Sequence, residues 1–259
     1  MPAMNEIIER RFGFIGARAR LITAPATGRV TIDVRRDRDR EHFELRLPNS
    51  ASAAVLDTDK SARHLLLLVT TDGEKSRFLC GHDERHWFVS AIPEAASGVV
   101  TARNAMEALQ PEAVRAAAHQ IRPKERLRRR TKVFRRQGEW FFVPVSDLEP
   151  DPRLVLRREP LSRGRGKPHI MEFAFRRGGT TVYVSRVHPT GLTQEKFDAL
   201  SDEERRKQSW RQMVRDAEVF ALGRIRHDDH ATLVLHGWHQ VFMNTEPGAR
   251  AMRHVAFLD

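Results

Sequence analysis

The stretch "RHLLLLVTTDGEKSRFLCGHDERHWFVSAIP", residues 63 to 93, decides the fold class of this chain. A run of apolar residues leads into the pair Asp72-Gly73, and two further apolar runs follow it. Asp-Gly between apolar runs is a strong short-range signal for a hairpin turn. Residues 28 to 48 have the same character, because apolar and polar residues alternate on both sides of a charged turn. Together these stretches predict a small antiparallel sheet or barrel within residues 1 to 100.

A helical segment is predicted directly after this β region. Thr101 is a typical N-cap for the residues that follow it, and Pro111 and Pro123 each suit the first turn of a helix. Gly138 is a typical helix terminator. We therefore expect helices within residues 101 to 137, with the last of them running through the basic string "PKERLRRRTKVFRR".

The rest of the sequence predicts a second module that mixes strands and helix. Aromatic and β-branched runs near both of its ends predict strands. Between them, "TQEKFDALSDEERRKQSWRQMVRDAEVFAL" predicts helix, since Ser201 and Glu204 have capping-box spacing. An apolar stripe at helical spacing extends this prediction through Trp210, Met213, Val214 and Ala217.

The expected fold class is therefore α+β, with two antiparallel β-rich modules joined by a helical, strongly basic segment. Residues 1–100 form the N-terminal β-rich module in this prediction. Residues 101–137 form the helical basic connector, and residues 138–259 form the C-terminal α+β module.

The composition indicates a folded protein. At 259 residues and 40% hydrophobic content, the chain can bury the core of one large domain or two small ones. No apolar run approaches the roughly 20 residues that cross a bilayer, and the N-terminal residues do not form a secretory signal. The single cysteine, Cys80, excludes an internal disulfide. We expect a cytoplasmic protein without membrane association, and its preference for arginine over lysine suggests a bacterial, GC-rich genome.

Positive charge is concentrated in one short part of the sequence. The formal net charge is +11, and residues 122 to 136 hold nine basic residues against one acid, Glu125. On a helix these side chains would repel one another unless a polyanion neutralised them. A nucleic-acid interface is therefore predicted, formed by Arg122, Arg126, Arg129, Arg130, Lys132, Arg135 and Arg136. The alternative is that acids elsewhere in the fold, such as those at 202 to 204, cover an ordinary connecting helix.

A second basic segment follows the first. Residues 153 to 167 hold six basic residues against one acid, Glu159, and their Arg-Gly-Arg-Gly pattern is typical of a mobile arm or of an ordinary surface loop. Arg163 and Arg165 are the predicted phosphate contacts here, and Trp140 is predicted to stack on a base. Loop cations and an aromatic residue, without a major-groove reading motif, favour RNA or single strands over duplex DNA.

A histidine and aspartate group lies near the end of the chain. In "IRHDDHATLVLHGWHQ", His227 and His230 flank two aspartates in a predicted hairpin turn. Imidazole and carboxylate groups bind divalent metals, so His227, Asp229 and His230 are the candidate metal ligands and catalytic residues of a hydrolase. A plain turn followed by a strand explains the same string without a metal. His169 and His188 are further candidates that the sequence does not place in space.

The string "CGHDERHWF" is the other concentration of reactive side chains. Cys80, His82 and His86 lie there with Asp83 and Glu84. A metal or thiolate site is one interpretation, and a polar turn between two strands is the other, since the spacing fits no zinc motif. The sequence lacks Walker, GxGxxG, GxSxG, HExxH and CxxC motifs, which disfavours the familiar routes to nucleotide hydrolysis, dinucleotide redox chemistry and serine hydrolysis.

The sequence supports three hypotheses about function. The leading one is a nucleic-acid-binding protein that contacts the phosphate backbone through a basic helix and an Arg/Gly loop. The second is a hydrolase or nuclease that depends on a divalent metal, in which the basic helix only steers the substrate. The third is an interaction protein that docks on an acidic partner.

Overall fold

The hairpin predicted around Asp72-Gly73 is present in the computed structural model. β5 (His64–Thr71) and β6 (Glu74–Asp83) pair antiparallel, and both turn residues have positive φ. β4 (Ser52–Asp59) and β7 (His86–Ala91) complete a four-stranded sheet in the order β4-β5-β6-β7. The structure describes residues 4–25, 28–38, 40–163, 167–250 and 252.

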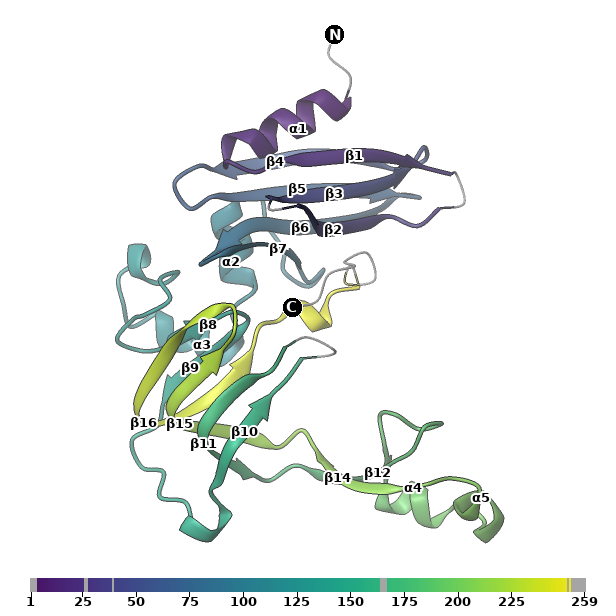
Figure 1. The fold of residues 1–259 in the computed structure, drawn as a ribbon, viewed down its shortest axis with the longest axis vertical. Coiled ribbons are helices and arrows are strands. Elements are labelled where there is room, and N and C mark those ends of the chain that lie inside the picture. The colour runs from purple at the N-terminus through teal and green to yellow at the C-terminus, as the bar shows by residue number, and fades with distance from the viewer. Residues whose placement is uncertain (1–3, 26–27, 39, 164–166, 251, 253–259) are drawn as a thin grey trace.

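A second sheet packs against the first and completes the N-terminal module (Figure 1). Its central strand is β3 (Arg40–Pro48), which pairs in parallel with β1 (Ala19–Ala24) and antiparallel with β2 (Thr31–Asp37). α1 (Met4–Phe14) lies against β1 and β4. Both sheets and the helix share one apolar core, which includes Phe12, Phe43, Leu65, Phe78 and Trp87.

Two short helices connect the modules. α2 (Ala102–Ala108) begins after Thr101, whose hydroxyl accepts the N–H of Asn104, so the predicted cap is confirmed. α2 packs against β5 and β6 on the face that points away from the first core. α3 (Glu112–Ala118) packs against β9 (Trp140–Pro144) of the second module. Among the described helices, none is long and apolar enough to cross a membrane.

The prediction of a long basic helix is wrong. Only Pro123–Glu125 form a short 3-10 turn, and the chain is then irregular until β8 (Arg135–Gln137). Thr131 explains the break, because its Oγ1 accepts the N–H groups of Val133 and Phe134, which a continuing helix would direct to backbone carbonyls. The basic segment, residues 122–136, is therefore a folded loop that ends in a short strand.

The C-terminal module is built on a six-stranded antiparallel sheet in the order β10-β11-β15-β16-β9-β8. Its remaining strands are β10 (Leu156–Leu161), β11 (His169–Arg177), β15 (Glu218–His227) and β16 (His230–Met243). β15 and β16 form a hairpin, and β11 pairs with the other edge of β15. The start of β11, the end of β15 and the start of β16 therefore meet at one end of this sheet.

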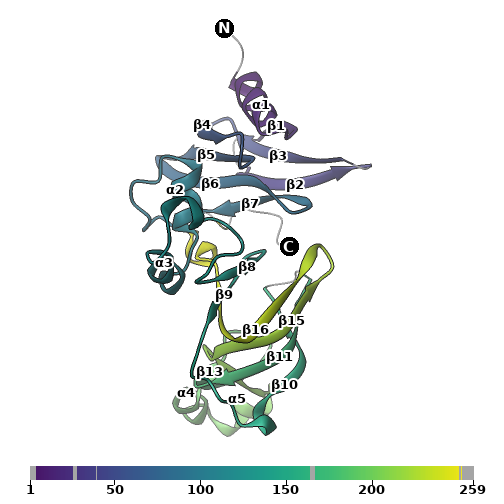
Figure 2. The ribbon, with the colours of Figure 1, turned by 90° about the vertical axis from the view of Figure 1, so that its left-hand side faces the viewer.

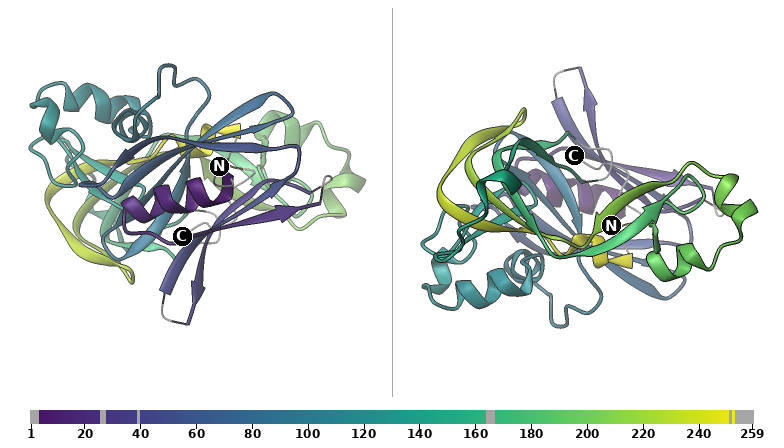
Figure 3. Two further views of the ribbon diagram at one scale, coloured as in Figure 1. Left: turned by 90° about the horizontal axis from the view of Figure 1, so that it is seen from above. Right: turned by 90° about the horizontal axis from the view of Figure 1, so that it is seen from below.

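A smaller sheet projects from this module (Figures 1 and 3). It consists of β12 (Thr180–Val184), β13 (Leu192–Thr193) and β14 (Arg211–Arg215), with β12 in the middle. α4 (Gln194–Asp198) and α5 (Asp202–Arg206) lie between β13 and β14 in the sequence.

The predicted helix is wrong in this region beyond α5. The capping box of Ser201 and Glu204 is present, as predicted. The stripe residues do not continue a helix. Trp210 directly precedes β14, and its ring packs edge-on against Phe197 at a centroid distance of 5.1 Å. Met213 and Val214 belong to β14. Their backbone N–H and C=O groups pair with β12 instead of forming the hydrogen bonds of the predicted helix.

The two modules stack along the long axis of the molecule (Figure 2). Glu246 holds them together from a position only 2% exposed. Its carboxylate accepts the backbone N–H of Ala91 at 3.3 Å and pairs with Arg163 at 3.0 Å. Thr245 adds a hydrogen bond from its backbone N–H to the carbonyl of Leu109.

His64 makes the stability of the fold depend on pH. Burial, followed by the charge of Arg136, lowers the pKa of its imidazole to about 4. The unfolded chain takes up this proton near pH 6.5, so the folded state loses stability as the pH falls from that value towards 4. Between pH 6 and pH 5 the free energy of unfolding should fall by about 1 kcal/mol less in His64→Gln than in the unaltered protein. Urea unfolding at both pH values measures this, and an unchanged loss would contradict it.

Candidate metal centre

Three histidines converge where β11, β15 and β16 meet. His169 begins β11, His227 ends β15 and His230 begins β16. One ligand nitrogen from each lies within 4.8 Å of the other two. The rings of His169 and His227 stack at a centroid distance of 4.3 Å, and His230 lies 5.5 Å from His169. Sheet pairing thus brings together imidazoles that lie far apart in the sequence.

His169 is the most unusual member of this cluster. It is 2% exposed, and neither of its ring nitrogens has a hydrogen-bond partner among the described residues. Burial, followed by the neighbouring His227 and His230, lowers the pKa of His169 to about 3. The ring is therefore neutral at physiological pH and keeps a lone pair for a ligand. A buried polar group without a partner costs about 1–3 kcal/mol, which a bound metal ion would offset.

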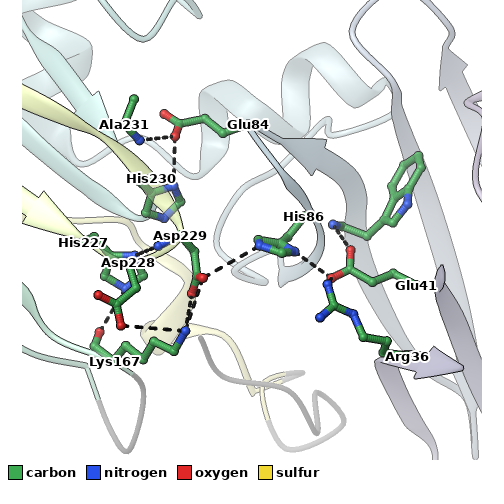
Figure 4. Close-up of polar contacts among 11 residues, drawn as sticks. Arg36, Glu41, Glu84, His86, Lys167, His227, Asp228, Asp229, His230 and Ala231 are labelled. Atoms are coloured by element: carbon green, nitrogen blue, oxygen red, sulfur yellow. Dashed lines mark hydrogen bonds and ion pairs between the residues drawn. The ribbon is translucent and has the colours of Figure 1, made fainter. Parts of the chain in front are cut away.

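His230 is oriented by an acid from the other module. Its Nδ1 lies 3.3 Å from a carboxylate oxygen of Glu84, which also accepts the N–H of Ala231 at 2.9 Å (Figure 4). Burial lowers the pKa of His230, against the opposing effect of Glu84. A carboxylate on the far nitrogen of a metal ligand fixes its tautomer and ring orientation. Nε2 of His230 faces the space beside Gly138, so it is the nitrogen available to a metal.

Gly138 leaves open the space beside these nitrogens. A Cβ on this residue would lie 3.1 Å from Nε2 of His230 and 3.5 Å from Nε2 of His169. Metal–imidazole bonds are about 2.1 Å long, so an ion bound by both nitrogens needs this kind of clearance. The sequence predicted Gly138 as a helix terminator, whereas in the structure it lies in the turn between β8 and β9 with a φ of +56°.

Gly138→Ala is expected to lower the affinity for Co²⁺ at least tenfold, about as much as the loss of a supporting residue does. Gly178→Ala is the matched control, because Gly178 has a similar φ of +66° and open space around its Cβ. Both substitutions impose left-handed strain of about 1 kcal/mol, so both should lower stability. Only Gly138→Ala should also need at least tenfold more Co²⁺ to reach the visible absorbance of the bound ion. Normal Co²⁺ binding by Gly138→Ala would place the ion elsewhere.

Both ring nitrogens of His227 have hydrogen-bond partners. Its Nδ1 accepts the N–H of Asp229 at 3.1 Å, and its Nε2 lies 3.3 Å from the carbonyl oxygen of Lys167. Since Nδ1 is an acceptor here, Nε2 carries the proton and donates it to that carbonyl. Binding a metal through Nε2 would require the other tautomer, with the proton on Nδ1, so the hydrogen bonds to Lys167 and from Asp229 would both be given up for the metal bond.

Asp229 does not join the three imidazoles, although the sequence predicted it as a ligand. Lys167 holds its carboxylate at 2.9 Å and is the main cause of its lowered pKa. The carboxylate instead faces Nε2 of His86 at 3.9 Å. Among the described residues, the third side chain of the cluster is His169, whereas the sequence predicted Asp229 as the third ligand.

A chain of polar contacts crosses from this turn to the N-terminal module (Figure 4). Nδ1 of His86 lies 2.7 Å from Oε1 of Glu41, whose other oxygen accepts the N–H of Trp87 at 3.1 Å. A carboxylate only accepts, so Nδ1 carries a proton, whereas Nε2 lies 3.9 Å from the Asp229 carboxylate, beyond hydrogen-bond range. His86 and Asp229 line one cavity of about 100 Å³ between the modules, together with His227 and His230.

The string "CGHDERHWF" is therefore divided between the core and the site. Cys80 is fully buried in the core of the N-terminal module, and burial raises the pKa of its thiol. His82 packs edge-on against Trp87 at a centroid distance of 4.9 Å. Glu84 and His86 face the C-terminal module instead.

The predicted nucleic-acid contacts fall into two groups. Arg129 pairs with Asp83 and Glu84, and Arg136 also pairs with Asp83. Other members bind nearby backbone carbonyls or the module interface: Arg126 to Ile121, Arg135 to Thr131, and Arg163 to Glu246. Those left exposed are Arg122, Arg130 and Lys132.

Two predicted contacts have a different outcome. Trp140 is 7% exposed and belongs to the core of the six-stranded sheet, so its ring offers no face for a base. Arg165 lies outside the described residues.

Comparison with models of protein families, with curated proteins and with solved structures finds no match to this chain. The chemistry of the site therefore has to be inferred from its geometry.

Proposed function

We propose that the protein is a metal-dependent hydrolase that cleaves single-stranded nucleic acid. In this proposal His169, His227 and His230 bind one divalent transition-metal ion. The observation that carries it is the convergence of three imidazoles, with a buried His169 that has no hydrogen-bond partner among the described residues. Three imidazoles suit zinc and similar ions, and they leave coordination positions for water and substrate.

The ion would supply the nucleophile, because metal binding lowers the pKa of a bound water to about 7. His86 would be the general base for a water at this site, because Nδ1 donates to Glu41 and leaves Nε2 to accept a proton. In hydrolysis of a phosphodiester, a bond from the water oxygen to phosphorus would form while the bond from phosphorus to the leaving sugar oxygen breaks. The proton held on Nε2 of His86 would then pass to that leaving oxygen.

Exposed cations support a polyanionic substrate. Within the described part of the chain, Arg122, Arg130 and Lys132 are exposed and have no ion-pair partner. They favour a second candidate function, which is binding of the nucleic-acid backbone without cleavage.

Metal content and cleavage test the proposal on the purified chain. We expect about one equivalent of zinc or a similar ion after reconstitution, and cleavage of a labelled single-stranded oligonucleotide that stops on chelation. A chain that binds no metal, or whose cleavage is unaffected by chelator, contradicts the proposal. Oligonucleotide binding without cleavage would favour the second candidate.

A further inference from the structure

A groove rich in arginine lies beside the candidate metal centre. It has a volume of about 400 Å³. Arg85 reaches it from the turn between β6 and β7, Arg129 and Arg130 from the basic segment, and Arg136 from β8. Gln137, Ala231 and Leu233 of the C-terminal module complete the lining with Glu84. We call it the arginine groove.

The charges of the arginine groove are only partly neutralised. Asp83 and Glu84 are the carboxylates that pair with its guanidinium groups, and both are bound by Arg129 or Arg136. Arg85 and Arg130 are exposed, and neither has an ion-pair partner within the described residues. Four guanidinium groups against two carboxylates leave a local excess of positive charge, so the groove is suited to an anion.

The arginine groove and the candidate metal centre share a wall. Glu84 lines the groove, and its carboxylate also lies 3.3 Å from Nδ1 of His230. Ala231, another lining residue, directly follows His230 in the chain. Arg136 borders both the groove and the cavity that contains His227 and His230. An anion in the arginine groove would therefore lie next to Glu84, whose carboxylate contacts the proposed metal ligand His230.

We propose that the arginine groove binds a backbone phosphate of single-stranded nucleic acid adjacent to the phosphate that is cleaved. This inference rests on the proposed function, because the position of the bound phosphate is defined relative to the proposed metal ion. A volume of this size suits one ligand of nucleotide dimensions. Guanidinium groups bind phosphate with paired hydrogen bonds, and within the described chain Arg85 and Arg130 are the two lining arginines with no competing carboxylate. A duplex presents two rigid backbones, whereas one flexible strand can enter a groove between two modules.

The test measures binding of a labelled single-stranded oligonucleotide by fluorescence anisotropy in the presence of chelator. We expect the double variant Arg85→Gln/Arg130→Gln to bind about tenfold more weakly or worse. The slope of log K against log salt should become shallower by about 1.4, because two single-strand phosphate contacts are lost. Arg186→Gln/Arg206→Gln is the matched control, since it removes the same charge from two exposed positions away from the groove, one in the loop after β12 and one at the end of α5.

A second comparison separates binding in the arginine groove from general electrostatic attraction to exposed cations. Arg122→Gln/Lys124→Gln removes two exposed cations of the basic segment that do not line the groove. The inference is overturned if this variant loses as much affinity as the groove variant, if the groove variant binds normally, or if a duplex of the same length binds more tightly. Because chelator is present, loss of groove binding and loss of metal-dependent cleavage are measured independently.

Discussion

Replacing His169 with glutamine is expected to abolish metal binding and all metal-dependent cleavage. Changing a residue that only supports a metal ligand lowers metal affinity about 10- to 100-fold, so removing a ligand should exceed about 100-fold. Glutamine keeps a polar side chain in the same space but has no imidazole nitrogen. Titration with Co²⁺, followed by visible absorbance, measures the affinity directly, and oligonucleotide cleavage measures the consequence.

His236→Gln is the control for this substitution. His236 is exposed on β16, the strand that carries His230, and it lies outside the cluster. The His236→Gln variant should bind Co²⁺ like the unaltered protein. In chelator His169→Gln should also be about as stable as the unaltered protein, because the imidazole of His169 has no hydrogen bond to lose among the described residues. Normal Co²⁺ binding by His169→Gln would remove His169 from the metal centre and overturn the proposed ligand set.

Local sequence signals predicted the elements that depend on near neighbours. The Asp72-Gly73 hairpin, the Thr101 cap and the capping box at Ser201 each need residues only a few positions apart, and all are present. The long basic helix was predicted from Pro123 and Gly138 at its two ends, and the extension beyond Glu204 was predicted from apolar residues at helical spacing; both are weaker signals. In one, the Thr131 side chain diverts the backbone, and in the other, β14 pairs with β12. Neither contact is visible in a helical repeat.

The metal centre was predictable only in part for the same reason. His227 and His230 lie opposite each other in one hairpin, so a local turn signal finds both. His169 joins them only because β11 pairs with β15, where Ile170 lies opposite Arg226. Nothing in the local sequence encodes that pairing, so the sequence named His169 only as a further candidate without a place in space.

The basic segment shows how tertiary contacts change the meaning of a charge run. Its arginines were predicted to face solvent together, but Arg129 and Arg136 pair with Asp83, which lies 46 and 53 residues away in the sequence. Burial lowers the pKa of both arginines to about 10, which still leaves them charged at neutral pH. Part of the run therefore attaches the modules to each other, and only the exposed remainder is available to a polyanion.

His86→Asn is expected to lower kcat for cleavage about 100- to 10,000-fold, the usual contribution of a general base. The reason is that His86 lines the same cavity as His227 and His230, while its Nδ1 is held by Glu41 at 2.7 Å. Asparagine cannot accept the proton of a metal-bound water. Co²⁺ affinity should stay unchanged, because His86 is not one of the three clustered imidazoles. Glu41→Gln should lower kcat less, since it changes only the group that orients His86.

The comparison with His82→Asn separates a catalytic loss from a structural one. His82 lies on the same hairpin and packs on Trp87, but it does not line the cavity. If His86 only braces the interface through Glu41 and Asp229, its replacement should lower stability and leave kcat close to that of His82→Asn. If His86 accepts the proton, kcat falls while KM and Co²⁺ affinity are retained. A loss of Co²⁺ binding in His86→Asn would instead mean that this histidine positions the metal centre, because the contact with Asp229 lies next to both His227 and His230.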